Sequence, residues 1–177
     1  MAPVLVVRGL SKWYLAGAGR SWARVRVLHG VSFVMRRAER LLLVGRRGSG
    51  KTTLLHCLAG LRHPDGGEVR WLADDRPVSE RWRALHETPA SLCAAAPALA
   101  LIDADAGHGR GDAWHSALAS PDLRHCGWLI ATADPAPFHG LCHRTLVLRD
   151  GQLHSTPAQR VARRVAEGIA PSCRMFR

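Results

Sequence analysis

The sequence has few acidic residues, no paired cysteines and no long apolar run, and each shortage excludes a class of protein. The five cysteines are odd in number, show no C-x-x-C spacing and follow no signal peptide, which favours a reducing cytoplasm over a disulfide framework. The longest apolar stretch, from Leu92 to Ile102, is broken by Pro97 and is too short to cross a bilayer. We therefore expect a cytoplasmic protein that meets a membrane only peripherally, at its inner face.

The shortage of acidic residues makes the chain strongly basic. There are 14 Asp and Glu against 25 Lys and Arg, for a formal net charge of +11 at pH 7. Such a charge attracts nucleotides, nucleic acid or anionic lipid headgroups, but it does not indicate a fold. The basic residues are scattered and are not interleaved with aromatic residues, so nucleic acid is only a minor hypothesis as a partner.

The most informative motif is G-R-R-G-S-G-K-T, from Gly45 to Thr52, which matches the phosphate-binding pattern G-x-x-x-x-G-K-[ST]. An apolar run precedes it and a helix-like segment follows it, which is the context that the pattern requires. Its glycines let successive N–H groups face phosphates, Lys51 would reach the β- and γ-phosphates, and Thr52 would offer a hydroxyl to Mg²⁺. The predicted nucleotide-contacting residues of this segment are Gly45, Gly48, Ser49, Gly50, Lys51, Thr52 and Thr53.

Apolar runs and turn signals predict the order of the elements. We expect strands over 4–7, 25–27, 31–34, 40–44, 68–72, 98–102, 128–131, 145–148 and 152–154, with breaks at 17–19 and 29–30 and a tight turn at 150–151. Helices are expected over 51–61, 78–86, 90–96 and 113–119, with a helical turn over 135–141 and a terminal helix from Pro157. This order predicts an α/β fold with a parallel sheet. It predicts a single P-loop domain over 1–177, comprising an antiparallel β subdomain (1–39), an α/β core (40–155) and a C-terminal helix and tail (156–177).

In their order along the chain these motifs resemble the nucleotide-binding subunit of ABC transporters. The matching segments are V31-S-F33, the loop from Gly45 to Thr52, T53-L-L55, A59-G-L61, P64-D-G-G-E-V69, the apolar strand into Asp103, and L148-R-D-G151. The resemblance implies a P-loop core of ABC-cassette type that binds ATP and Mg²⁺. It also implies that Tyr14 stacks on adenine, with Trp13 as the reserve, and that Asp103 and Thr52 hold the metal. From the residues alone, both rings could equally pack on the antiparallel strands.

The chain departs from the family where hydrolysis is performed. Ala104 stands where the family has the glutamate that polarises water, and Ala133 stands where it has the histidine that contacts the γ-phosphate. Asp105 follows one position later, and strand alternation would send its side chain to the opposite face from that of Ala104. We therefore predict that Asp105 is a poor substitute for the glutamate, and we assign no catalytic residue.

The segment between Thr53 and Asp103 is also too short for the family pattern. It spans about 50 residues, contains no Gln, and shows neither the helical subdomain nor the L-S-G-G-Q signature. We expect an ATP-binding subunit that binds MgATP or MgADP with impaired hydrolysis, and that has an ABC permease or a competent partner cassette as its candidate partner. The alternatives are a non-catalytic, nucleotide-stabilised interaction module and a decaying relic of a cassette.

Overall fold

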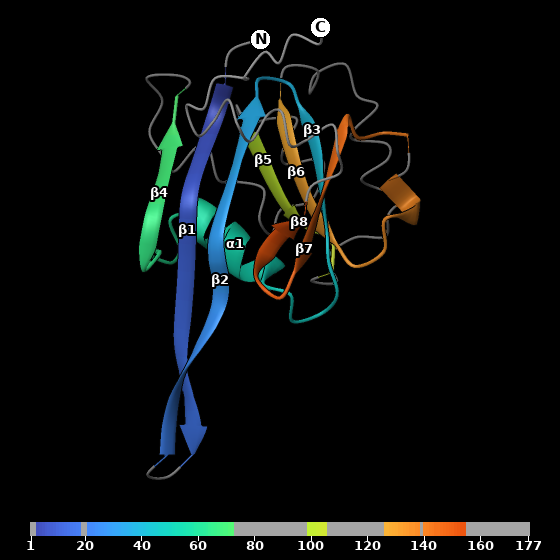
Figure 1. Ribbon diagram of the computed structural model, residues 1–177. Coiled ribbons are helices and arrows are strands. Elements are labelled where there is room, and N and C mark those ends of the chain that lie inside the picture. The colour runs from blue at the N-terminus through green and yellow to red at the C-terminus, as the bar shows by residue number, and fades with distance from the viewer. Residues whose placement is uncertain (1–2, 19–20, 73–98, 106–125, 139, 155–177) are drawn as a thin grey trace, which may run out of the picture.

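The computed structural model describes residues 3–18, 21–72, 99–105, 126–138 and 140–154, which form two β-sheets with one α-helix packed between them (Figure 1). The helices expected over 78–86, 90–96 and 113–119 and from Pro157 onward lie outside the described residues. So does the greater part of the segment between β4 and β5, where the family's helical subdomain and signature would fall.

The larger sheet has the strand order β5-β6-β3-β7-β8. Strands β5 (Leu99–Asp103), β6 (Gly127–Thr132), β3 (Arg40–Val44) and β7 (Arg144–Arg149) run parallel, and β8 (Gln152–His154) pairs antiparallel with β7. β3 therefore lies between strands that come much later in the chain. Because parallel strands end at one edge of a sheet, this order brings the loops after β3, β5 and β6 together.

The helix α1 (Lys51–Leu58) begins directly after the glycine-rich loop and ends three residues earlier than expected. Its end is set by Gly60, which takes a left-handed backbone conformation with φ 65°. The N–H of Leu61 then bonds back to the carbonyl of His56 at 3.0 Å, which satisfies a helix-terminal carbonyl. The helix buries Leu54, Leu55 and Leu58, and it contacts strands of both sheets.

The smaller sheet is antiparallel, with the order β2-β1-β4, and its third strand comes from the segment that we expected in the α/β core. It consists of β1 (Pro3–Ala18), β2 (Ser21–Arg36) and β4 (Gly66–Trp71). Figure 1 shows the far half of the β1–β2 hairpin projecting beyond the rest of the molecule. Leu15 and Trp22 are 66% and 63% exposed there, because no other described element covers this part of the ribbon.

The break expected at His29 and Gly30 is wrong, because β2 continues through both residues. The turn expected over 17–19 is displaced, because β1 continues to Ala18 before the chain reverses and pairs Ala18 with Ser21. Gly30 adopts φ 69°, which lets the strand change register against β1 without ending. Its N–H donates to the Ser11 hydroxyl at 3.0 Å, so this irregular backbone keeps a hydrogen-bond partner.

The central strand β3 divides its side chains between two hydrophobic clusters. Leu41 and Leu43 belong to the cluster that fills the space between the sheets around α1, whereas Leu42 belongs to a second cluster with Trp128 and Phe138. The alternation follows from the two-residue period of a strand. Burying each leucine contributes about 1.5–3 kcal/mol, so packing on both faces fixes the strand that leads into the glycine-rich loop.

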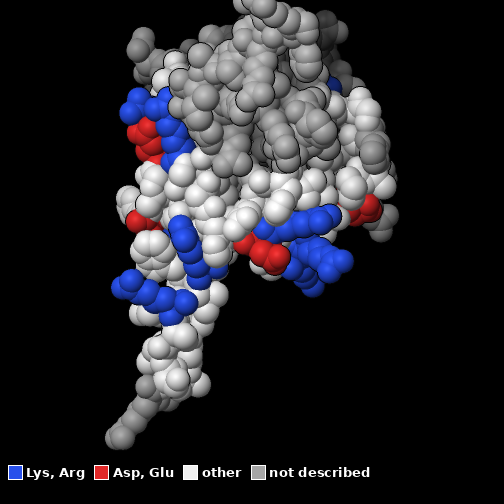
Figure 2. Space-filling view, viewed as in Figure 1, with Lys and Arg blue, Asp and Glu red and all other residues white. Residues whose placement is uncertain are grey.

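Charged side chains do not form one continuous basic surface in the view of Figure 2. The Lys and Arg residues appear as separate groups on the hairpin and on the body, and acidic residues lie next to several of them. Arg8 and Arg70, for example, both contact Glu68, at 3.4 and 2.9 Å. On this face the described residues therefore offer local basic groups and no unbroken track for a nucleic-acid backbone.

Candidate functional site

The loop between β3 and α1 is shaped by its glycines. Gly48 and Gly50 take φ values of 80° and 102°, in the region that disfavours residues with a Cβ. The loop is anchored at its start by the N–H of Gly45, which donates to the carbonyl of Thr132 at 3.1 Å, and within itself by the N–H of Ser49, which donates to Arg46 O at 3.1 Å. The sequence predicted such a curled loop, and its geometry is confirmed.

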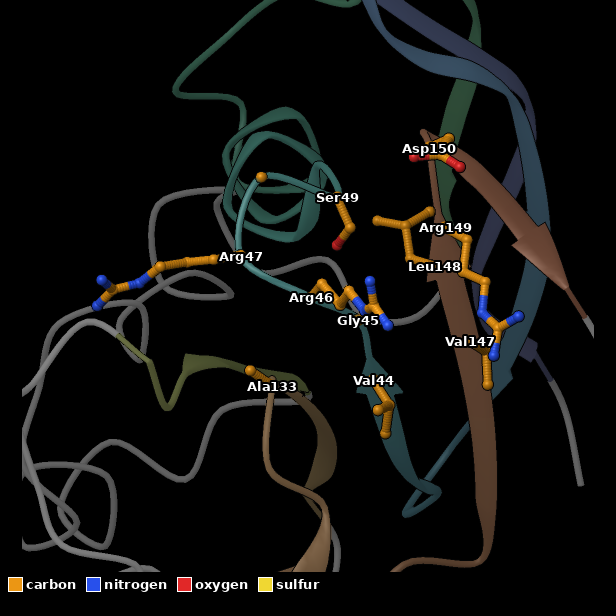
Figure 3. A pocket seen from close by; sticks show the side chains of 11 residues that line it. Val44, Gly45, Arg46, Arg47, Ser49, Ala133, Val147, Leu148, Arg149 and Asp150 are labelled. Carbon is orange, nitrogen blue, oxygen red and sulfur yellow. The ribbon is translucent and has the colours of Figure 1, made fainter.

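Gly45 and Ser49 hold the loop against β7. A Cβ on Gly45 would lie 2.5 Å from both the Leu148 carbonyl oxygen and the Ser49 hydroxyl, so the position has room only for glycine. Ser49 is 7% exposed, and its hydroxyl makes no hydrogen bond with the described residues. Both residues line a cavity of about 510 Å³ between the loop and the β7–β8 turn, in which Figure 3 shows the Ser49 oxygen, Arg46 and Arg149.

Lys51 is buried at the first position of α1 and has three acceptors. Its Nζ donates to the carbonyls of Gly45 and Arg46 at 2.6 and 3.1 Å, and it lies 3.1 Å from a carboxylate oxygen of Asp105. The side chain is only 5% exposed. An ammonium has three protons, so these three contacts use its full donor capacity and direct it back over the loop.

Thr52 and Asp103 meet next to Lys51. The Thr52 hydroxyl donates to the Asp103 carboxylate at 2.5 Å, which joins the start of α1 to the end of β5. The sequence predicted that these two residues share a Mg²⁺ site, and the structure brings them together. Two hard oxygen ligands in one cavity with the lysine suit a cation that also binds phosphate oxygens.

The main site cavity has a volume of about 580 Å³ and opens beside α1. Its walls carry Gly48, Gly50, Lys51, Thr52, Thr53 and Asp103 from the predicted set, together with Val27, Arg47, His56 and Asp105. Gly45 and Ser49 line the neighbouring cavity on the other side of the loop. Seven of the predicted loop residues thus border the two cavities, and Asp103 joins them from a different element.

Asp105 has a position that the sequence interpretation missed. Its carboxylate contacts Lys51, accepts from the N–H of Ala133 at 2.8 Å, and lies 3.4 Å from the Thr132 hydroxyl. Strand alternation does not apply to it, because β5 ends at Asp103 and the chain turns there. The N–H of Asp105 donates to the Asp103 carboxylate at 3.2 Å, which supports this turn. The prediction overlooked that a turn can direct Asp105 toward the loop.

The two alanines that replace the family's hydrolytic residues lie on different sides of the site. Ala104 packs against the hydrophobic cluster of Trp128 and Phe138, and it therefore faces away from Lys51. Ala133 borders the cavity of Figure 3 and contributes only its backbone N–H, which is given to Asp105.

Tyr14 lies apart from the loop on β1 and lines neither of the two cavities. Its ring is approached by Lys12 and Arg62, whose cationic groups lie 5.6 and 5.5 Å from the ring centroid. Trp13 is approached separately by Arg24 at 5.8 Å. Stacking of Tyr14 on a nucleobase therefore remains a prediction. The described residues contain no cluster of three or more His, Cys, Asp or Glu side chains that could hold a metal ion.

The family model that matches the chain is described as ABC transporter, and it covers residues 28–100, which include the glycine-rich loop, α1 and β4. Over these residues the chain is similar to the ATP-binding subunits of ABC transporters. The curated relatives include an Fe(3+) ions import ATP-binding protein, FbpC, of Haemophilus influenzae, which is 42% identical over 72 residues, covering 41% of this chain and 18% of the relative. Another is an aliphatic sulfonates import ATP-binding protein, SsuB 1, of Nocardia farcinica. It is 33% identical over 123 residues, covering 62% of this chain and 49% of the relative.

The fold of the family is confirmed by solved structures. The structure of an ATP-binding subunit of an ABC transporter superposes with a TM-score of 0.65 at 19% identity, covering 96% of this chain and 95% of that one. The fold is therefore the α/β P-loop core of ABC-cassette type that the sequence predicted. The chain spans less than half the length of the two curated relatives named above. No helix among the described residues has the length and apolar character needed to span a membrane.

Proposed function

We propose that the chain binds MgATP or MgADP through the Gly45–Thr52 loop as an ATP-binding subunit, and that it hydrolyses ATP poorly or not at all. The observation that carries the proposal is the convergence of Lys51, Thr52 and Asp103 on one cavity beside a loop held open by left-handed glycines. Backbone N–H groups and the start of α1 would face the phosphates.

The contribution of each polar group follows from its chemistry. Lys51 would give a proton donor and a positive charge to the β- and γ-phosphates. Thr52 would ligate Mg²⁺ directly and Asp103 would hold it through water, and a bound cation would offset phosphate charge. Arg47 lines the same cavity and adds positive charge at its edge. We retain Tyr14 as the proposed adenine platform, because a stacked base is worth about 1–3 kcal/mol of affinity.

Impaired hydrolysis is the second part of the proposal. Ala104 packs into a hydrophobic cluster and Ala133 has no side chain that could reach a phosphate, so neither residue can orient water. Phosphoryl transfer to water needs a positioned nucleophile as well as bound phosphates. The alternative, a nucleotide-stabilised interaction module, also agrees with these two alanines and differs only in having no transport partner.

A thermal-stability titration tests the binding claim. A ligand that binds only the native state stabilises it by about 2.7 kcal/mol at 100 times its Kd, so the Tm should rise with MgATP or MgADP concentration. Lys51→Ala should remove the rise. Arg70→Ala is the matched control, because Arg70 is an exposed cation on β4 that contacts only Glu68 among the ion pairs of the described residues. An unchanged Tm of the parent protein in millimolar nucleotide would reject the proposal.

Phosphate release tests the hydrolysis claim. We expect turnover at the assay background for the parent protein, and no rescue by Ala104→Glu, because that side chain would start from a position facing the hydrophobic cluster. Phosphate release by the parent protein at a rate on the order of 1 per second, lost in Lys51→Ala, would contradict impaired hydrolysis.

An ABC permease or a competent partner cassette is the proposed protein partner, and any contact with a membrane is proposed to be peripheral. With a formal charge of +11, binding to an anionic surface should depend on ionic strength. We expect release from membrane fractions as salt rises from about 0.05 to 0.5 M, and a monomer in sedimentation experiments. Retention through this wash or a stable ATP-dependent homodimer would point to a partner interface of another kind.

A further inference from the structure

The proposed function gives no role to Asp105, although this charged residue lies in the same site. It lies in the same cavity as Lys51, Thr52 and Asp103, and its carboxylate is 3.1 Å from the Lys51 ammonium. Ala104, its neighbour in the chain, lines neither of the two cavities. The contacts of Asp105 therefore need an explanation of their own.

We propose that Asp105 is a specificity-determining residue that makes the site prefer nucleoside diphosphates over nucleoside triphosphates. This inference rests on the proposed function, because it concerns which nucleotide the loop binds.

The first step is that Lys51 has no spare donor for a phosphate. Its three protons are matched by Gly45 O, Arg46 O and Asp105. The two carbonyls belong to the loop that would hold the phosphates, so a phosphate at Lys51 competes most directly with the Asp105 carboxylate.

The second step is that Asp105 cannot swing far from the lysine. Its Oδ1 accepts from the N–H of Ala133 at 2.8 Å, and its own N–H is bound by Asp103 at 3.2 Å. The Thr132 hydroxyl also lies 3.4 Å from the same Oδ1. These contacts connect it to the loops after β5 and β6, so its negative charge stays beside any group that Lys51 contacts.

The third step is electrostatic. The lysine of a phosphate-binding loop reaches the β- and γ-phosphates, so Asp105 would lie near the end of the phosphate chain, where a triphosphate carries its additional charge. Two like charges about 4 Å apart repel by about 1–4 kcal/mol in surroundings between water and a protein surface. Because about 1.4 kcal/mol is a factor of ten in affinity, the lower end of this range corresponds to about fivefold, and we expect MgADP to bind at least about fivefold more tightly than a magnesium triphosphate.

The test compares Kd values for MgADP and for a non-hydrolysable Mg-ATP analogue by isothermal titration calorimetry. Asp105→Asn keeps the size of the side chain and its carbonyl acceptor for Ala133 but removes the charge. We expect this variant to bring the ratio of the two Kd values to within about threefold, chiefly through tighter triphosphate binding. Asp134→Asn is the matched control, since Asp134 follows the same strand as Ala133 but is exposed, and its Oδ1 accepts from the N–H of Ala136. It should keep the parent ratio.

Three results would overturn the inference while leaving the proposed function intact. They are equal Kd values in the parent protein, an unchanged ratio in Asp105→Asn, and the same change in the Asp134→Asn control. If Asp105→Asn does not fold, Asp105→Glu still tests the inference, because it keeps the negative charge. It should retain the preference for the diphosphate. Loss of this preference in Asp105→Glu would be a fourth result against the inference. If the parent protein binds neither nucleotide, the proposed function is wrong and the inference falls with it.

Discussion

Gly151 connects the β7–β8 turn to two other parts of the molecule, and we predict that Gly151→Ala weakens both connections. Its carbonyl accepts from the N–H of His29 on β2 at 2.9 Å, and its N–H donates to Ser49 O in the glycine-rich loop at 3.2 Å. Its φ is 71°. A Cβ at this position would collide with the Val27 carbonyl oxygen and approach the His29 ring to 2.6 Å.

The size of the effect follows from two separate penalties. A left-handed conformation costs a residue with a Cβ about 1–2 kcal/mol. The collision with backbone adds about 1–3 kcal/mol, because a carbonyl oxygen can give way only if the strand moves. We therefore expect Gly151→Ala to lower the free energy of unfolding by about 2–5 kcal/mol.

Gly140→Ala separates the two penalties. Gly140 also has a positive φ, of 76°, but a Cβ there would meet no atom of the described residues within 4 Å. It should cost only about 1–2 kcal/mol. Urea unfolding followed by circular dichroism measures both variants. Equal losses for the two, or no loss for Gly151→Ala, would refute the claim that close packing of this turn against β2 stabilises the fold.

Three further predictions concern single side chains. Arg144 has a side chain that is 19% exposed, and its Nε lies 2.9 Å from the carboxylate of Glu39. Glu39→Ala removes this carboxylate and should lower the free energy of unfolding by about 1–3 kcal/mol in urea melts. An unchanged unfolding midpoint would contradict this. Burial raises the pKa of the Cys126 thiol to about 12. Alkylation of Cys126 at pH 8, followed by peptide mass spectrometry, should therefore be much slower in the folded protein than in urea. Equal alkylation rates would be contrary to the prediction. The hydrogen bond from the N–H of Trp13 is the main cause that holds the pKa of Asp65 below its ordinary value of 3.8. A lowered pKa stabilises the fold above pH 3.8, and this contribution disappears as pH falls through the folded pKa. The stability difference between the parent and Asp65→Asn should therefore shrink below pH 3.8, and a difference that grows in acid would refute the sign.

The glycine-rich loop, the buried parallel strands and the Asp150–Gly151 turn could be predicted from the sequence because each depends on local chemistry. The run from Arg40 to Val44 is apolar and short, which favours a strand buried on both faces. Asp150 and Gly151 have φ values of 46° and 71°, the conformation that an Asp-Gly pair adopts most readily in a hairpin. These signals do not depend on distant parts of the chain.

The features that the sequence did not predict depend on contacts between distant segments. Gly30 looked like a strand break, yet the hydroxyl of Ser11 on β1 accepts its N–H and β2 continues. The contact between Asp105 and Lys51 requires a turn after β5 and an N–H from the loop after β6. The i, i+2 spacing of Asp103 and Asp105 was the one signal in the sequence for this contact, because an Asp side chain can accept from the N–H two residues later and so favour a turn.

Equilibrium dialysis of MgADP against the parent protein and Lys51→Ala tests most directly whether the Gly45–Thr52 loop binds nucleotide. Lys51 is the buried cation of the loop, and its Nζ donates to Gly45 O at 2.6 Å. We predict saturable binding to the parent protein, with a stoichiometry of about one as expected for a single phosphate-binding loop, and loss of most of this binding in the variant. No binding by the parent at millimolar MgADP, or equal binding by parent and variant, would contradict it.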